Sequence, residues 1–166
     1  KLLIADEPTT ALDVTVQAQI LDLLAREQQR RHMAMILITH DLGVVAGMAH
    51  RVALMYAGQI VEVATAAAFF AAPKHPYAKA LLAAMPDAKH KGQALTAIAG
   101  TVPALSQTFV GCRFAPRCGQ ALASCATTLP PWLELGAQHG VRCVLLDPSQ
   151  QRSNDITPVA GMTSAT

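Results

Sequence analysis

The first forty residues alternate between short apolar runs and one segment of helical period. Leu2–Ala5 and Met35–Ile38 are continuous apolar runs, the pattern of strands buried on both faces of a parallel sheet. Between them apolar residues recur at helical spacing from Val14 to Arg31, and Asp13 before them is a suitable N-cap. The pattern predicts a strand–helix–strand unit.

Beyond residue 41 the pattern predicts shorter elements. Ala57-Gly58 suits a hairpin turn, since glycine tolerates a positive φ. From residue 87 to 148 Gly, Pro and Cys dominate, as expected of a small module held by a metal or disulfides. Residues 149–166, rich in Ser, Gln, Asn, Thr and Pro, predict a disordered tail. The expected elements are a helix over 42–49, strands over 51–56 and 59–64, and helices over 66–72 and 75–85.

Composition excludes several classes of protein. The chain has 166 residues and a formal net charge of +2, with no basic stripe for nucleic acid. No apolar run reaches the roughly 18 residues of a membrane-spanning helix, and no signal peptide is visible. We expect a soluble cytoplasmic chain. It begins at Lys1 within an apolar segment and without an initiator Met, so we expect its start to lie inside a longer domain.

Two adjacent carboxylates, Asp6 and Glu7, follow the first strand. Open α/β sheets bind ligands at the carboxyl ends of their strands, where one carboxylate can hold hydrated Mg²⁺ and the next can orient a water molecule. A bare Asp-Glu-Pro is ordinarily a solvated turn, so the context decides. The unbroken run Leu-Leu-Ile-Ala-Asp-Glu-Pro-Thr-Thr-Ala-Leu-Asp from Leu2 to Asp13 closely resembles the Walker B and D-loop segment of ATP-binding-cassette proteins.

This resemblance implies an α/β fold, the distal half of a P-loop nucleotide-binding domain, with ATP and Mg²⁺ as ligands of the intact protein. It places Asp6 on the Mg²⁺ of bound ATP and Glu7 as the general base that polarises the attacking water. Asp13 belongs to the D-loop, which crosses a dimer interface toward the partner's nucleotide. Thr39-His40-Asp41 matches the switch region, in which His40 contacts the γ-phosphate and the attacking water.

The phosphate-binding elements of that family do not occur in these 166 residues. There is no G-x-x-x-x-G-K-[ST] loop and no Leu-Ser-Gly-Gly-Gln signature, and in the family both precede the Walker B strand. Without the backbone N–H cradle and its lysine we expect negligible ATP affinity. The chain alone is therefore expected to be inactive, although the intact protein would be an ATPase, a translocase coupled to transport.

A second group of motifs lies in the distal part of the chain. The motifs are, in order, His75-Pro76-Tyr77, Leu81-Leu82, Gly100-Thr101-Val102-Pro103 and Gly111-Cys112-Arg113-Phe114-Ala115-Pro116-Arg117-Cys118. This series resembles the carboxy-terminal extension of oligopeptide and dipeptide importer ATPases, with the departure that Ala99 stands where the family often has proline. We assign residues 1–72 to the nucleotide-binding domain, 73–148 to the extension and 149–166 to the tail.

Four cysteines, Cys112, Cys118, Cys125 and Cys143, are separated by five, six and seventeen residues. With no export signal, clustered cysteines more often hold a metal or cluster than form disulfides. Cys₄ sets hold both Fe–S clusters and Zn²⁺, but zinc sites usually pair ligands at two to four intervening residues. Members of the branch with these cysteines are understood to bind a [4Fe-4S] cluster, and the resemblance implies these four as ligands. Zinc, and unligated or disulfide-bonded cysteines, remain alternatives.

Three further residues near the cysteines have two interpretations each. Arg113 and Arg117 either offset the negative charge of a bound cluster or are solvated surface residues. His139 is either a ligand or, beside Gly140, an exposed residue, and we favour the latter.

The resemblance also implies partners. Two homologous, non-identical ATPase subunits would sandwich ATP and drive two transmembrane permease subunits, fed by an external substrate-binding protein, at the cytoplasmic face of a bacterial inner membrane. The sequence leaves the substrate open among dipeptides, oligopeptides, murein peptides, glutathione and nickel complexes. A non-catalytic iron–sulfur or metal-binding regulatory module is the alternative function. A cassette protein of DNA repair or translation is disfavoured because the chain lacks a basic stripe.

Overall fold

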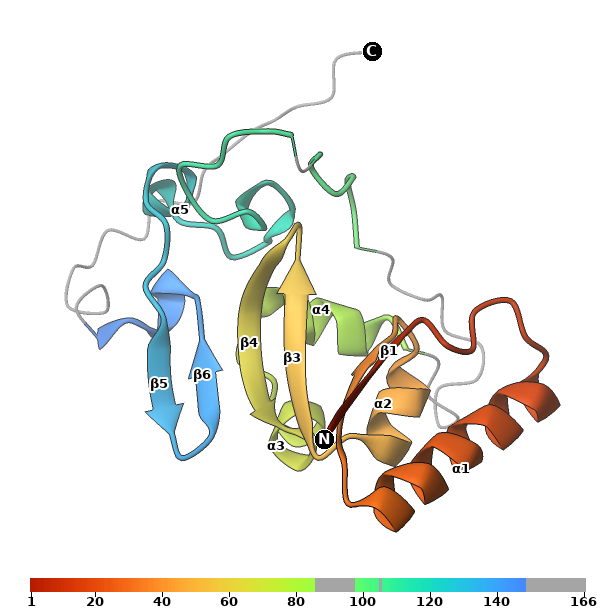
Figure 1. Cartoon of the computed structure of the whole chain (residues 1–166). Helices are drawn as coiled ribbons and strands as arrows, with labels where there is room; N and C mark the ends of the chain where they lie inside the picture. The colour runs from red at the N-terminus through yellow and green to blue at the C-terminus, as the bar shows by residue number, and fades with distance from the viewer. Residues whose placement is uncertain (86–97, 105, 149–166) are drawn as a thin grey trace. The chain divides into compact units, whose positions relative to one another are not determined.

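A computed structural model describes residues 1–85, 98–104 and 106–148. These form two compact units, Lys1–Ala49 and a second that begins at His50 (Figure 1). The tail predicted over 149–166 lies outside the described residues. The predicted boundary at residue 72 separates the nucleotide-binding domain from the carboxy-terminal extension. It does not describe compact units, and it stays a prediction.

The first unit has the predicted strand–helix–strand order. It consists of β1 (Leu2–Asp6), α1 (Val14–Arg31), β2 (Ala34–Ile38) and α2 (Leu42–Met48). Strands β1 and β2 are parallel, with Ile4 opposite Ile36 and Asp6 opposite Ile38. The carboxyl ends of both strands therefore lie at the same edge of the sheet.

The expectation that both faces of these strands are buried is wrong for the described residues. Side chains alternate along each strand, and the face that carries Leu2, Ile4, Ile36 and Ile38 is exposed, with exposed fractions of 47 to 60%. Partners in a parallel pair share a face, so this is one continuous apolar surface. In the described part of this unit, the two-stranded sheet is covered only on its other face, where Ala5 is buried.

The second unit begins with the predicted hairpin, β3 (Arg51–Tyr56) and β4 (Gln59–Thr65). Its turn has positive φ at Ala57 (45°) and Gly58 (76°), as a two-residue hairpin loop requires. The helices α3 (Ala66–Ala71) and α4 (Pro76–Ala83) follow. Helix α4 has a proline in its first turn, where no helical hydrogen bond from the proline nitrogen is needed.

The remaining elements are short. They are η2 (Ala115–Arg117), α5 (Ala123–Thr127), β5 (Leu133–Gly136), β6 (His139–Val141) and η3 (Val144–Leu146). Strands β5 and β6 extend the hairpin into an antiparallel sheet of order β3-β4-β6-β5, which the sequence pattern did not predict. The cysteine-rich segment is thus built onto the hairpin's sheet.

An aromatic cluster forms the core of this unit. Phe114, 2% exposed, lies 5.1 Å from the ring of Tyr56 and 5.3 Å from that of Tyr77, which are themselves 4.8 Å apart. Cys112 and Cys118 pack against the same cluster. The core therefore joins the hairpin, the first turn of α4 and the cysteine loop.

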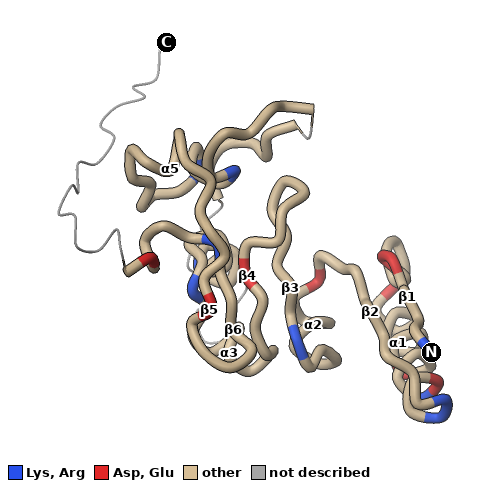
Figure 2. The backbone as a smooth tube through the Cα atoms, turned by 60° about the vertical axis from the view of Figure 1, so that its left-hand side comes forward, with Lys and Arg blue, Asp and Glu red and all other residues tan. Residues whose placement is uncertain are grey.

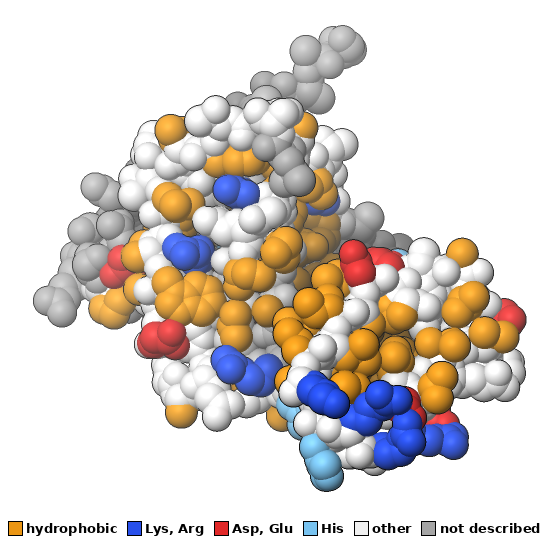
Figure 3. Space-filling view, viewed as in Figure 1, with side chains coloured by type: hydrophobic (Ala, Val, Ile, Leu, Met, Phe, Trp, Pro, Cys, Tyr) orange, Lys and Arg blue, Asp and Glu red, His pale blue; other side chains and the backbone are white. Residues whose placement is uncertain are grey.

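Charged and hydrophobic side chains share the surface of the described residues. Charged residues of both signs are dispersed along the described chain (Figure 2), and hydrophobic side chains are exposed between them (Figure 3). Within the described residues no helix is long and apolar enough to cross a membrane.

Candidate functional site

The ends of β1 and β2 place the predicted catalytic residues side by side. The Glu7 backbone N–H donates to the carbonyl of Ile38 at 2.9 Å, so the strand pairing continues one residue beyond Asp6. Glu7 itself has a φ of 48°, a conformation that costs a non-glycine residue on the order of 1 kcal/mol and that often occurs at functional sites. Asp6 is exposed at the end of β1.

Glu7 and His40 are in direct contact. The His40 Nδ1 atom lies 2.9 Å from Glu7 Oε1, and the Thr10 hydroxyl donates to the other carboxylate oxygen. The hydrogen bonds from His40 and Thr10 lower the pKa of Glu7, and Glu7 raises the pKa of His40. An ionised carboxylate beside a readily protonated imidazole can orient a water molecule on one side and hold anionic charge on the other.

Two aspartates fix the loops around this pair. Asp13 accepts hydrogen bonds from the backbone N–H groups of Thr15 and Val16, at 3.0 and 2.9 Å, and caps α1. Asp41 caps α2 and also accepts from Gln17 Nε2 at 3.1 Å, which ties α1 to the loop that carries His40. The contribution of Gln17 was not predicted, because nothing in the sequence links it to residue 41.

The four cysteines gather in the second unit as free thiols. The Cys112 backbone N–H donates to the carbonyl of Cys125 at 2.8 Å. Burial raises the pKa of Cys112, of Cys118 and, to about 11, of Cys143, and the neighbouring cysteines raise each of these further. The four cysteines are therefore close enough for the charge of one thiolate to raise the pKa of its neighbours.

Backbone hydrogen bonds oppose the effect of burial on these thiols. The backbone of Phe114 and Ala115 lowers the pKa of Cys112, that of Gln120 lowers the pKa of Cys118, and that of Leu145 lowers the pKa of Cys143. Leu122 donates to the Cys125 sulfur at 3.4 Å. Such donors stabilise thiolates and tune thiolate-bound clusters, so the donor chemistry fits a group held by cysteines. Among the described residues, however, no three side chains converge closely enough to form a site for a single metal ion.

The arginines of the cysteine loop tether it to neighbouring backbone. Arg117 donates from Nε to the Ala99 carbonyl at 2.8 Å and from Nη2 to the Ile98 carbonyl at 2.7 Å. Arg113 donates to the Ala57 carbonyl and stacks on the Phe109 ring, 4.6 Å from its centroid. Neither is simply a solvated residue, and their effect on the charge of a bound group stays a prediction.

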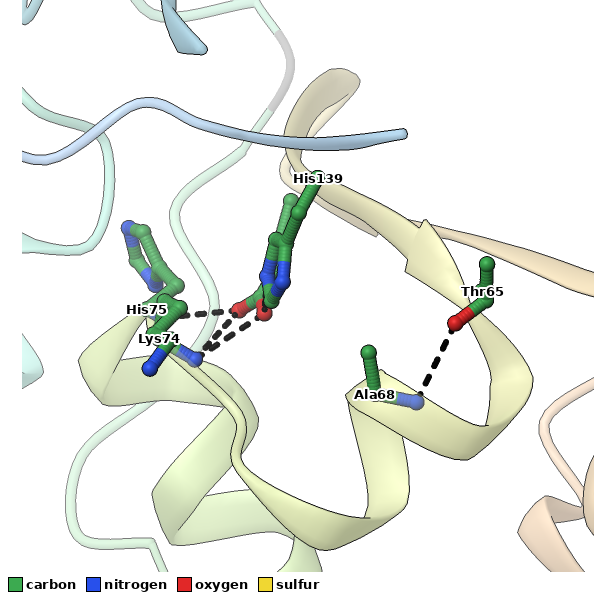
Figure 4. Close-up of polar contacts among 6 residues, drawn as sticks. Thr65, Ala68, Lys74, His75 and His139 are labelled. Atoms are coloured by element: carbon green, nitrogen blue, oxygen red, sulfur yellow. Dashed lines mark hydrogen bonds and ion pairs between the residues drawn. The ribbon is translucent and has the colours of Figure 1, made fainter. Parts of the chain in front are cut away.

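Glu62, on β4, carries a buried carboxylate, and its partners Lys74, His75 and His139 are labelled in Figure 4. Its oxygens accept the backbone N–H of Lys74 at 2.9 Å and that of His75 at 2.7 Å. His139 Nε2 lies 2.8 Å from the Glu62 Oε1 atom. The expectation that His139 is exposed is wrong: its side chain is only 13% exposed, because β6 pairs with β4 and brings it onto Glu62.

His75, the first residue of the His-Pro-Tyr motif, is 1% exposed. Its Nδ1 atom accepts the Tyr77 backbone N–H at 3.0 Å and so caps α4. Burial lowers the pKa of His75 to about 4, against the influence of Glu62 and of a hydrogen bond with the backbone of Arg142. The ring is therefore neutral at physiological pH, with its Nδ1 atom held as the acceptor that caps α4.

With this geometry in view, the relatives can be compared. Residues 61–125 match the family described as the oligopeptide/dipeptide transporter C-terminal region. The match runs from β4 through the third cysteine, so it includes Glu62, His75 and Phe114 and stops before Cys143.

Three curated relatives are also similar to this chain. The chain is 49% identical over 149 residues to a peptide import ATP-binding protein of Brucella ovis, covering 86% of this chain and 44% of the relative. It is 52% identical over 130 residues to the dipeptide transport ATP-binding protein DppD of Escherichia coli, covering 78% and 40%. It is 49% identical over 147 residues to the oligopeptide transport ATP-binding protein AppD of Bacillus subtilis, covering 89% and 45%.

The resemblance inferred from the motifs is thereby confirmed. The chain spans less than half the length of the curated relatives it matches. The individual roles of Asp6, Glu7, Asp13, His40 and the four cysteines stay predictions.

Proposed function

We propose that this chain is the distal part of an ATP-binding subunit that energises peptide import across a bacterial cytoplasmic membrane. The observation that carries the proposal is the contact between Glu7 and His40 at the tips of two paired parallel strands. The names of the relatives, which are peptide, dipeptide and oligopeptide transport ATP-binding proteins, support the same class of activity.

In this proposal Glu7 accepts the proton of the attacking water, and its lowered pKa keeps it ionised for that role. His40 holds the water and the γ-phosphate through the edge of its ring. Asp6, one residue before Glu7, holds Mg²⁺, and Asp13 presents the D-loop to a second ATPase subunit. Two permease subunits and an external substrate-binding protein complete the transporter, with the ATPase peripheral at the cytoplasmic face.

The test is the substitution Glu7→Gln in a polypeptide that joins this chain to the phosphate-loop segment of the protein. ATP turnover should fall by about 10²–10⁴-fold, while ATP binding persists because Gln leaves the phosphate site untouched. Glu134→Gln is the matched control, since Glu134 is exposed and contacts Trp132 rather than the site. Unchanged turnover in the Glu7→Gln protein would refute the assignment.

For the 166 residues alone we propose that ATP binding is negligible. The support is the lack of any phosphate-binding loop in the sequence. Titration calorimetry with Mg-ATP should give no measurable heat of binding, and a micromolar affinity would contradict the proposal.

We further propose that Cys112, Cys118, Cys125 and Cys143 bind a [4Fe-4S] cluster rather than zinc. The support is the set of four neighbouring thiols with backbone N–H groups on their sulfurs. The spacing of five, six and seventeen intervening residues also favours a cluster over Zn²⁺, whose ligands usually pair at two to four intervening residues. Such a group would supply electron-transfer or structural chemistry, while the chain holds it and shields it from solvent.

Anaerobic reconstitution tests this second proposal. The chain should take up iron and sulfide in equal numbers and show visible charge-transfer absorption, and Cys→Ser variants should lose both. A colourless protein that retains zinc and no iron would exclude the cluster.

The alternative function is a non-catalytic metal-binding module, which the four thiols favour on their own. It is the better description if the cluster forms but Glu7→Gln leaves the ATP turnover of the joined polypeptide unchanged.

A further inference from the structure

The His40 side chain, just beyond β2, is largely open to solvent. It is 77% exposed, and its Nδ1 atom contacts Glu7 Oε1 at 2.9 Å. A ring with so little packing around it takes its place from the backbone that carries it. The contact between His40 and Glu7 therefore depends on how the loop of residues 39–41 is anchored.

Asp41 anchors this loop through both oxygens of its carboxylate. Oδ1 accepts the backbone N–H groups of Gly43 at 2.8 Å and Val44 at 3.2 Å, at the start of α2. Oδ2 accepts from Gln17 Nε2, on α1, at 3.1 Å. Against the effect of burial, the hydrogen bonds from these three donors lower the pKa of Asp41. The residue next in sequence to the switch histidine is thus an ionised acceptor that joins two helices.

Gln17 ties the loop to the start of α1. It stands one turn after the N-cap Asp13, and its backbone N–H donates to the Asp13 carbonyl at 2.8 Å, so its side chain extends from a fixed backbone. The bond from Gln17 to Asp41 spans 24 positions and is partly buried. Partial shielding from water strengthens a hydrogen bond, and so does the charge of the acceptor. This bond therefore holds the loop more firmly than an exposed contact between neutral groups would.

We propose that Gln17 is a positioning residue: by fixing the Asp41 carboxylate, its amide keeps the loop in the place that brings the His40 ring against the carboxylate at the end of β1. The consequence for ATP hydrolysis rests on the proposed function of His40 and Glu7, whereas the anchoring of the loop does not. Because Gln17 lies one turn from Asp13, one side chain joins the segment proposed to face a second ATPase subunit to the loop that carries His40.

The experiment reverses the direction of this hydrogen bond. Gln17→Leu removes the donor while keeping a good helix former in α1, and Gln17→Glu places a second carboxylate against Asp41. The double variant Gln17→Glu/Asp41→Asn restores the bond at the wild-type net charge, because the amide at position 41 donates to the carboxylate at position 17 and its oxygen still caps α2. Gln19→Leu is the matched control, since Gln19 is exposed on the same helix.

The first readout is hydrogen exchange of the Gly43 and Val44 amides in this chain alone, since both donate to Asp41. Gln17→Leu should lower their protection about fivefold, the equilibrium ratio of one net hydrogen bond, and Gln17→Glu should lower it at least as much. The double variant and the control should match the wild type. Equal protection in Gln17→Leu and the wild type would overturn the proposal, as would a double variant no better protected than Gln17→Glu.

The second readout is ATP turnover in the polypeptide joined to the phosphate-loop segment. Gln17→Leu should lower kcat about fivefold and leave KM for ATP unchanged, because the phosphate loop is untouched. The double variant should recover kcat. A wild-type kcat in Gln17→Leu, or a kcat that stays low in the double variant, would overturn the link to His40. If Glu7→Gln leaves turnover unchanged, the proposed catalytic pair fails, while the exchange rates still decide whether Gln17 anchors the loop.

Discussion

Glu62 offers the sharpest test of how the second unit is held together. Its carboxylate is fully buried and accepts the backbone N–H groups of Lys74 and His75, and it pairs with His139. These contacts connect β4, the start of α4 and β6. Replacing Glu62 by Ala leaves the N–H groups of Lys74 and His75 and the His139 ring without this acceptor.

The expected cost follows from those partners. A buried donor that loses its acceptor costs about 1–3 kcal/mol, and Glu62→Ala takes the acceptor from two backbone N–H groups and from the His139 ring. Because these three losses overlap, we expect Glu62→Ala to lower the free energy of unfolding by about 3–5 kcal/mol. Glu62→Gln keeps the shape and one acceptor oxygen, so its cost should be about 1–3 kcal/mol.

Urea unfolding followed by circular dichroism measures both changes. Glu134→Gln is the control, because Glu134 is exposed and its change should lie within about 0.5 kcal/mol of zero. Hydrogen exchange localises the effect: the amides of Lys74 and His75 should lose protection in Glu62→Ala. A midpoint for Glu62→Ala equal to that of the control, or unchanged exchange at both amides, would refute the reasoning.

Three other predictions concern single contacts. Glu7→Gln should bring the pKa of His40 down toward its ordinary 6.5, and NMR titration measures this change. In the wild type the ion pair is lost as the pH falls through the lowered pKa of Glu7 or rises through the raised pKa of His40. An identical His40 pKa in the variant and the wild type would exclude the pair. Gly111→Ala should destabilise the chain by more than about 1–3 kcal/mol, because a Cβ there overlaps a backbone carbonyl. Gly119→Ala, which meets nothing within 4 Å, is its control, and equal melting temperatures would disprove the clash. Asp13→Ala should cost about 1 kcal/mol through the lost N-cap of α1, and unchanged protection of the Thr15 amide would contradict this.

Local patterns predicted the elements of the first unit and the hairpin of the second. The helix predicted over 14–31 is observed with the same bounds, because its apolar period and the Asp13 cap are local properties. The turn at Ala57-Gly58 was predictable for the same reason. The adjacency of Glu7 and His40 followed from parallel pairing, which brings the ends of successive strands to one edge.

Pairings between distant short segments were not predictable. Strand β6 has three residues, His139–Val141, which are too few to show the alternation of apolar and polar side chains that predicts a strand. It becomes a strand because β4 offers it hydrogen bonds, and this pairing turns His139 inward onto Glu62. The apolar runs of β1 and β2 predicted two covered faces, but a run shows only that the side chains are apolar and not how many layers pack on them.

The sequence by itself determined the identity of the chain's chemistry: the carboxylates, the histidine and the four thiols are set by residue type and order. Only the tertiary structure decided which of them meet. Glu7 reaches His40 across 33 positions, and Glu62 reaches His139 across 77, because backbone pairing brings distant segments within hydrogen-bonding range. Such contacts depend on geometry that no local run of residues encodes.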